Sequence, residues 1–215
     1  MTATLCDLHH ASVLITSSAH RALGGLIWVP ATSFIGRAPT LFWSTLFGFI
    51  FTIAAAVSPT FPCFYAMRAL QGLTITSCQT IAMAFIKDIF FFHERARKIG
   101  LWALLYIASP YLGPLFANFI LGSTNRWRLV FWTGVAACGI DLILIIAFLD
   151  ETWYNREIPP EQQPPRGRGF GSRMLRIVGV WQLRHRRTYY ETVYESFKKF
   201  FLTLTKPVIP LVLFV

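Results

Sequence analysis

One arginine, Arg68, lies within an otherwise apolar stretch of the chain, MRALQGLTITSCQTIA. Helical geometry places several polar or small residues on its side of the helix, namely Gln71, Gly72, Thr76 and Gln79. A charge inside a bilayer is costly, so it usually faces the interior of a helix bundle or a wet cavity. We interpret this stripe as the wall of an aqueous path. The alternative is a buried polar network that holds helices together.

A second group of residues lies in the uncharged stretch 99–122. Pro110 and Pro114 each remove a backbone donor and bend a helix. Small residues, which let helices approach closely in a membrane, recur every four positions at Ser109, Gly113 and Ala117. We expect Asn118 to be a buried amide beside this face. These residues fit a helix that acts as a gate, and they fit a kinked packing helix at least as well.

Helices that cross a bilayer are needed to position these residues. The 215 residues are 54% hydrophobic and 14% charged, against about 25% charged residues in soluble domains. Since about 20 apolar residues cross a membrane as a helix, the sequence predicts an all-α integral membrane protein. The expected bundle covers residues 11–154, with spans at about 11–35, 40–58, 62–87, 99–122 and 128–149. Asp141 is a lone acid in the last of them, and we favour pairing with a neighbouring helix or a headgroup over a role as proton carrier.

The rest of the chain is polar or too short to span. Residues 1–10 form a polar N-terminus, and residues 155–206 form a basic loop. Residues 207–215 begin a further span that is cut off, because nine residues cannot cross a bilayer.

Lysine and arginine gather in three alternate loops. The loops at 36–39, 87–98 and 150–206 carry one, four and eleven of the 20 Lys and Arg residues, and the opposite side carries only Arg126 and Arg128. Because such loops stay in the cytoplasm, we predict that all three are cytoplasmic. The net charge of +10 therefore reflects membrane topology, and we expect a lipid bilayer rather than nucleic acid as partner.

Within the basic loop, one segment has apolar residues at helical spacing, namely Tyr190, Val193, Tyr194, Phe197, Phe201 and Leu204. Lys198 and Lys199 lie beside this stripe. An amphipathic helix of this kind binds an anionic inner leaflet, where each basic residue gains about 1 kcal/mol. A cytoplasmic helix packed under the bundle is the alternative, and the sequence favours neither.

The sequence has no nucleophile–base pair, no metal-ligand spacing and no nucleotide-binding loop. Its four cysteines are scattered and lie mostly within apolar runs. We therefore expect no enzyme activity, no cofactor and no metal site.

Several motifs together resemble the major facilitator superfamily. The stretch Arg68-Ala69-Leu70-Gln71-Gly72 matches the R-x-x-Q-G motif of that family's fourth helix. Gly113-Pro114, with Gly100 upstream, is similar to the fifth-helix motif of its drug:proton antiporters, with Ser109, Ala117 and Asn118 in place of other glycines.

Loop motifs carry the rest of the resemblance. Trp28-Val29-Pro30 through Gly36-Arg37 resembles the loop between the second and third helices, with Ser33 in place of its acid and Ala38 in place of its second basic residue. The segments 93–100 and 150–154 are similar to the cytoplasmic ends of helices four to six in fungal members. Over residues 28–154, the chain resembles the fungal 12-helix drug:proton antiporter branch.

The resemblance implies two six-helix halves, a central cavity and alternating access. Transport of a small-molecule substrate would be coupled to protons, across the plasma membrane in preference to the vacuolar membrane. The chain would hold helices two to six and the start of helix seven, without helix one or the second half. We expect such a partial chain not to transport by itself. The alternative is a non-transporting, truncated membrane protein with at most a binding or interaction role.

The motifs also assign roles to residues. The substrate or proton pathway would contain Arg68, Gln71, Gln79 and Asn118. Helix bending and packing would depend on Gly72, Gly100, Ser109, Gly113 and Pro114. A cytoplasmic latch would consist of Gly36, Arg37, Arg95, Arg97 and Glu151. Because Asp150 and Glu151 follow a helix C-terminus, where the dipole disfavours negative charge, we expect Arg95 or Arg97 to pair with Glu151.

Overall fold

The computed structural model describes residues 20, 23–152, 169–184 and 192–206. The predicted polar N-terminus at 1–10 and the predicted partial span at 207–215 lie outside these residues, as do Tyr190 and much of the basic loop. The described part consists of helices and short connections, with no strand. The helices are Leu23–Phe34, α2 (Arg37–Val57), α3 (Phe61–Ile89), α4 (Phe92–Thr124), α5 (Trp127–Phe148), α6 (Phe170–Val178), α7 (Val180–Arg184) and α9 (Val193–Leu204).

Four helices, α2 to α5, are long and apolar enough to cross a membrane. They overlap the four clearer ranges expected from hydropathy. Two of the expected loops are shorter than predicted. The 36–39 loop before α2 reduces to a junction at Gly36, and the 87–98 loop between α3 and α4 reduces to a break at Phe90 and Phe91. Helix α4 has 33 residues, about 50 Å of helix against about 30 Å of hydrocarbon. The charged first turns of α4 therefore extend beyond the bilayer core.

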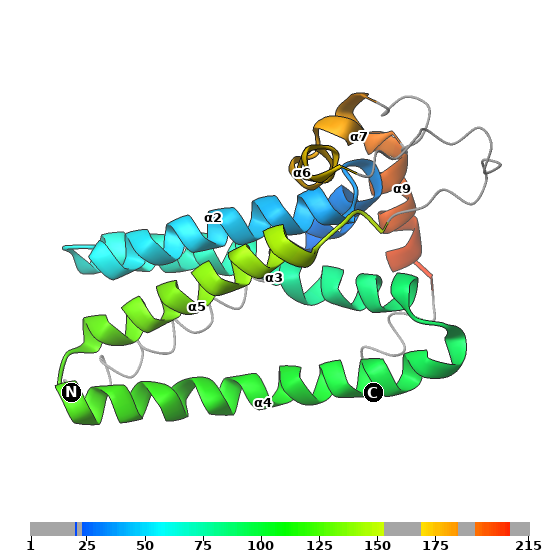
Figure 1. The fold of residues 1–215 in the computed structure, drawn as a ribbon. Coiled ribbons are helices and arrows are strands. Elements are labelled where there is room, and N and C mark those ends of the chain that lie inside the picture. Colours follow the sequence, from blue (N-terminus) through cyan, green and yellow to red (C-terminus); the bar gives the residue numbers. More distant parts are fainter. Residues whose placement is uncertain (1–19, 21–22, 153–168, 185–191, 207–215) are drawn as a thin grey trace.

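Helix α2 packs along α3 and α5, whereas α4 contacts its neighbours α3 and α5 much less. Figure 1 shows α4 as a separate green helix that approaches the others mainly where its connections begin. In the described part of the chain, α4 has no buried residue, while α2 has nine. The packed core of the described bundle is thus formed by α2, α3 and α5.

Small polar residues form much of the interface between α2 and α3. The hydroxyls of Thr52 and Ser77 donate to backbone carbonyls of their own helices, at 2.6 and 2.9 Å. Hydroxyls satisfied in this way leave a small surface that allows close helix packing in a membrane. The preceding helix approaches α3 even more closely, because a Cβ atom on Gly24 would lie 2.2 Å from the Leu73 carbonyl oxygen. Trp28 Nε1 donates to the same carbonyl at 3.0 Å.

The two ends of the bundle differ in charge. In Figure 1, α2 and α4 begin, and α3 and α5 end, at one end of the bundle, where α6, α7 and α9 also lie. We call this the basic end, since it brings together the described parts of the three Lys- and Arg-rich loops. Helices α6 and α9 lie across this end, with axes that cross those of α2 to α5. The sequence prediction that this end faces the cytoplasm stays a prediction.

Candidate functional site

Arg68 begins a chain of hydrogen bonds from α3 to α2. Its Nη1 donates to Gln71 Oε1 at 2.8 Å, and Gln71 Nε2 donates to Thr52 Oγ1 at 2.7 Å. Thr52 Oγ1 in turn donates to the Gly48 carbonyl at 2.6 Å. We call Arg68, Gln71 and Thr52 the Arg68 relay. Because Gln71 and Thr52 are only 7% and 4% exposed, the relay connects the guanidinium to the centre of the helix packing.

The Arg68 side chain itself stays exposed in the described bundle. It lies seven residues into α3, about 10 Å along the helix, and its Cζ is 5.5 Å from the centroid of the Phe131 ring on α5. Cation–π contact of this kind stabilises a desolvated guanidinium. An arginine does not release its proton in a protein. Arg68 can therefore act as a fixed positive charge, and any proton carrier must be another group.

The other expected pathway residues are less closely connected. Gln79 is half-buried on α3, eight residues and about 12 Å beyond Gln71. Asn118 is exposed on α4, and no hydrogen bond among the described residues joins it to the Arg68 relay. The expectation that Asn118 is a buried amide is therefore wrong for this structure, because α4 is not packed against the helices that would cover it.

The expected bending residues have different surroundings in α3 and α4. Gly72 is buried in α3. On α4, a Cβ atom added at Gly100 or Gly113 would meet no described atom within 4 Å, and Ser109 and Pro114 are exposed. Helix α4 continues through both of its prolines. The close-packing face predicted around Gly113 thus has no partner among the described residues.

The start of α2 joins the end of α3 at the basic end. Gly36 has φ 103°, a conformation that glycine adopts without the strain of a side chain, and this turns the chain into α2. Arg37 Nη1 donates to the Ala84 carbonyl at 2.9 Å, and the same side chain forms an ion pair with Asp88. Thr152 Oγ1, which follows α5, donates to Asp88 Oδ2 at 3.3 Å.

Glu151 caps the N-terminus of α2 from the far end of α5. Its carboxylate accepts hydrogen bonds from the backbone N–H groups of Arg37 and Ala38, at 3.2 and 3.3 Å. Gln182 Nε2 donates to it at 3.1 Å, and the Glu151 residue is only 4% exposed. The first amides of a helix have no partner within the helix, and they carry its positive dipole end. A buried carboxylate is thus stabilised where α2 begins.

Two arginines of α6 hold that helix against the end of α5. Arg176 donates to both carboxylate oxygens of Asp150, at 2.9 and 2.8 Å. Arg173 donates to the carbonyls of Leu149 and Ala147, at 2.9 and 2.7 Å. These carbonyls close the C-terminal end of α5, where a cation is favoured. Trp43 Nε1 of α2 adds a 3.0 Å hydrogen bond to the Val178 carbonyl at the end of α6.

The Asp150–Arg176 pair changes the pKa of both groups. Burial would raise the pKa of the Asp150 carboxyl, but hydrogen bonds from Arg176 and the Glu151 backbone, together with the charges of Arg176 and Arg173, hold the pKa below its ordinary value. The hydrogen bond to Asp150 raises the pKa of Arg176, against the opposing effect of burial. We call Arg37, Asp88, Asp150, Glu151, Arg176 and Gln182 the basic-end network.

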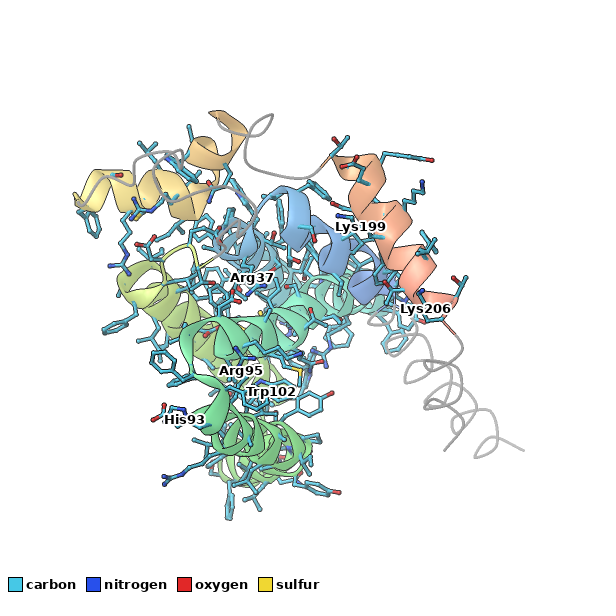
Figure 2. The ribbon with its side chains drawn as sticks, turned by 90° about the vertical axis from the view of Figure 1, so that its right-hand side faces the viewer. Arg37, His93, Arg95, Trp102, Lys199 and Lys206 are labelled. Atoms are coloured by element: carbon cyan, nitrogen blue, oxygen red, sulfur yellow. The ribbon has the colours of Figure 1, made fainter. Side chains whose placement is uncertain are left out.

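The predicted pairing of Glu151 with Arg95 or Arg97 is not the arrangement in this structure. Arg95 instead donates to the carbonyls of Lys87 and Phe90, at 2.6 and 3.4 Å, and thereby caps the end of α3. Figure 2 looks onto the basic end and shows Arg37 among the helices, with Arg95 next to the start of α4. Arg97 is exposed on α4, and no ion pair between described residues joins it to Glu151.

Sequence reasoning missed Arg176, Gln182 and Asp88 as members of this network. The acids after α5 indicate a need for positive partners, but the structure supplies Arg176 of α6, to Asp150, in place of the expected Arg95 or Arg97 of α4. The segment 170–178 has the pattern of an amphipathic helix, with Arg173 and Arg176 three residues apart among apolar residues. This pattern is the signal in the sequence that could have identified Arg176.

These features define a multi-pass, all-α membrane protein with a charged group in one span and a network that joins helix ends on one side. The sequence model of the Major Facilitator Superfamily matches residues 7–214. The chain therefore belongs to the Major Facilitator Superfamily.

Several fungal transporters are similar to it. The chain is 33% identical to polyamine transporter 2 of Saccharomyces cerevisiae over 132 residues, which are 61% of this chain and 21% of that protein. It is equally identical, over the same shares, to multidrug transporter TPO3 of Candida glabrata. It is 29% identical to quinidine resistance protein 3 of Saccharomyces cerevisiae over 129 residues, 59% of this chain and 18% of that protein. The chain thus aligns with about a fifth of the length of these relatives, and no solved structure matches it.

Proposed function

We propose that this chain forms part of a proton-coupled transporter that moves a small organic molecule across a membrane by alternating access. The observation that carries the proposal is the Arg68 relay, an exposed guanidinium within a spanning helix, connected through Gln71 to buried Thr52 on α2. A charge at that place is expensive unless it faces polar surroundings. Rearrangement of water, protons or substrate around Arg68 would act directly on the packing of α2 against α3.

The proton carrier that we propose is Asp141. Arg68 cannot release a proton, and Asp141 is the one acid within α2 to α5 that lies far from a helix end. It is exposed on α5, and no ion pair to it is found among the described residues. A carboxyl there can be neutral or charged according to what faces it. It therefore has the chemistry that coupling requires.

The basic-end network supports alternating access. Its pairs lie at the ends of α2, α3 and α5, and among its members only Asp150, whose side chain is 47% exposed, forms an ion pair near water. An ion pair at a wet surface contributes only about 0–1 kcal/mol. The buried contacts of Glu151 favour the conformation described here, and the more exposed Asp150 pair is the contact that exchanges during a transport cycle.

The names of the relatives direct the choice of substrate. They are named for polyamines, for multiple drugs and for quinidine resistance. Polyamines and quinidine are amines that carry positive charge near neutral pH, and we propose such an organic amine as the substrate class. We propose the plasma membrane as the location. Fluorescence microscopy of a tagged chain in a fungal cell tests this, and we expect the signal at the cell periphery and not at the vacuole.

A chimera tests the transport proposal. Residues 28–154 of this chain replace their counterparts in the yeast polyamine transporter, and the product is reconstituted into vesicles that contain a pH-sensitive dye. Spermidine should then drive proton movement. We expect Arg68→Ala to abolish it, and Asp141→Asn to stop proton movement while spermidine still binds. The matched control is Arg128→Ala, which removes an arginine of the first turn of α5 that contacts the Trp127 ring.

Two results would count against the proposal. A chimera that inserts and folds but shows no spermidine-dependent proton movement would argue against a transporting role for this segment. Full activity in Arg68→Ala would argue against the Arg68 relay. The same assay on the 215-residue chain tests the expectation that it does not transport alone, which substrate-dependent proton movement would contradict.

A further inference from the structure

Helix α9 lies in the plane expected for the membrane surface. Figure 1 shows its axis crossing those of the spanning helices at the basic end. The end-on view in Figure 2 shows α9 at the edge of the bundle, with Lys199 and Lys206 along it. In both views α9 lies beside the helix Leu23–Phe34. A helix with this position and direction meets the headgroup layer of the leaflet that borders the basic end.

One face of α9 is turned toward the protein. Ser196 is 4% exposed, and three apolar neighbours on its side of the helix, Val193, Phe197 and Phe200, are half-buried. At 100° per residue these four residues cover a sector of about 100°. Packing beneath the bundle, which was one of two interpretations of this amphipathic segment, thus describes only this inner face.

The opposite face of α9 is apolar and exposed. Tyr194, Phe201 and Leu202 are 72%, 58% and 55% exposed. They also lie within a sector of about 100°, and Lys198, which is exposed, lies between them. Lys206 is exposed just beyond the helix end. Large apolar side chains and a lysine on the same outer face are typical of helices that lie in a membrane interface.

We propose that this outer face of α9 is seated in the leaflet at the basic end and binds anionic lipid headgroups through Lys198 and Lys206. The apolar side chains enter the boundary between headgroups and acyl chains, and the lysines remain at the level of the phosphates. Charge complementarity selects the occupant, since the described α9 segment at 192–206 carries three lysines against one glutamate. The inference concerns the membrane surface and does not depend on transport.

A fluorophore at position 202 tests the proposal in the full chain. The native cysteines are replaced, Leu202→Cys is labelled with an environment-sensitive dye, and the protein is placed in nanodiscs of phosphatidylcholine alone or with about a third phosphatidylserine. Lipids brominated near the headgroup report contact with the leaflet, and aqueous iodide reports contact with water. We expect strong quenching by the brominated lipid in the anionic discs and weak quenching by iodide.

Charge variants separate the contribution of the lysines from that of the apolar face. Each lysine replaced by glutamine, Lys198→Gln or Lys206→Gln, should lower the ratio of lipid-seated to water-exposed dye about fivefold, the equivalent of about 1 kcal/mol. Arg97→Gln is the matched control, because Arg97 is an exposed basic residue of the basic end on another helix. It should leave the ratio unchanged.

Three outcomes would overturn the proposal. The first is efficient iodide quenching with no lipid quenching in either disc, which would place the outer face in water. The second is equal lipid quenching in neutral and anionic discs and in all variants, which would exclude headgroup charge. The third is protection from both quenchers, which would mean that protein covers the face.

Discussion

Replacing Glu151 by alanine removes a carboxylate that caps a helix 113 and 114 residues away in the chain. The substitution leaves the backbone N–H groups of Arg37 and Ala38 without their acceptor, and it leaves Gln182 Nε2 without one of its two acceptors. Since Glu151 is 4% exposed, water cannot easily take its place. We expect the start of α2 and the contact with α7 to loosen together.

The magnitude follows from the three hydrogen bonds. Loss of a helix cap costs about 0.5–2 kcal/mol, and a hydrogen bond to a charged group contributes about 1.5–3 kcal/mol. The bonds are long, at 3.1 to 3.3 Å, so the lower values apply. We expect Glu151→Ala to lower the free energy of unfolding by about 2–3 kcal/mol. Glu151→Gln keeps one acceptor oxygen and should cost about 1 kcal/mol.

Equilibrium unfolding in mixed micelles, followed by tryptophan fluorescence, measures these differences. Glu94 offers a matched control, because it is a glutamate near the N-terminus of another helix, in the first turn of α4, but its side chain is 52% exposed. Glu94→Ala should therefore cost under about 1 kcal/mol. The reasoning is refuted if Glu151→Ala unfolds within about 0.5 kcal/mol of the unaltered chain, or no more easily than Glu94→Ala.

Three further predictions concern the basic end, helix packing and topology. The pKa of Asp150 is held below its unfolded value, so the contribution of its pair with Arg176 is fully present above about pH 4 and is lost as the pH falls through the folded pKa. Spin-label distances between α6 and α5 should therefore lengthen only in acid, and Asp150→Asn should show the longer distance at every pH. Gly24→Ala should destabilise the bundle by about 1–3 kcal/mol, because its Cβ would lie 2.2 Å from a backbone oxygen, whereas Gly25→Ala, whose nearest neighbour is at 3.9 Å, should be nearly neutral in the same unfolding assay. A single cysteine at Gly169 should react with an impermeant thiol reagent only after the cells are opened, and labelling in intact cells would contradict the predicted cytoplasmic location.

Hydropathy alone predicted the four helices that are long and apolar enough to cross a membrane, because burial in lipid demands about 20 apolar residues wherever a helix crosses. Helix ends were less predictable. The charge of residues 92–98 predicts a loop, yet these residues form the first turns of α4. Charge prevents a segment from lying in hydrocarbon, but it does not prevent a helix from continuing into water. For the same reason, α2 already begins at the charged residue Arg37, and the junction at Gly36 is shorter than the loop expected there.

The sequence by itself determined the class of protein, its four long apolar helices and the polar stripe of α3, since these depend on periodicity and charge along one segment. It also singled out Arg68 and Gln71 as pathway residues and Arg37 and Glu151 as latch residues. Only the tertiary structure decided which partners they have. Gln71 meets Thr52 across 19 residues, and Glu151 meets α2 across more than a hundred. Spacing in the chain says nothing about contacts at that range, because they depend on how helices pack and on which orphan amides or carbonyls lie nearest to a charge.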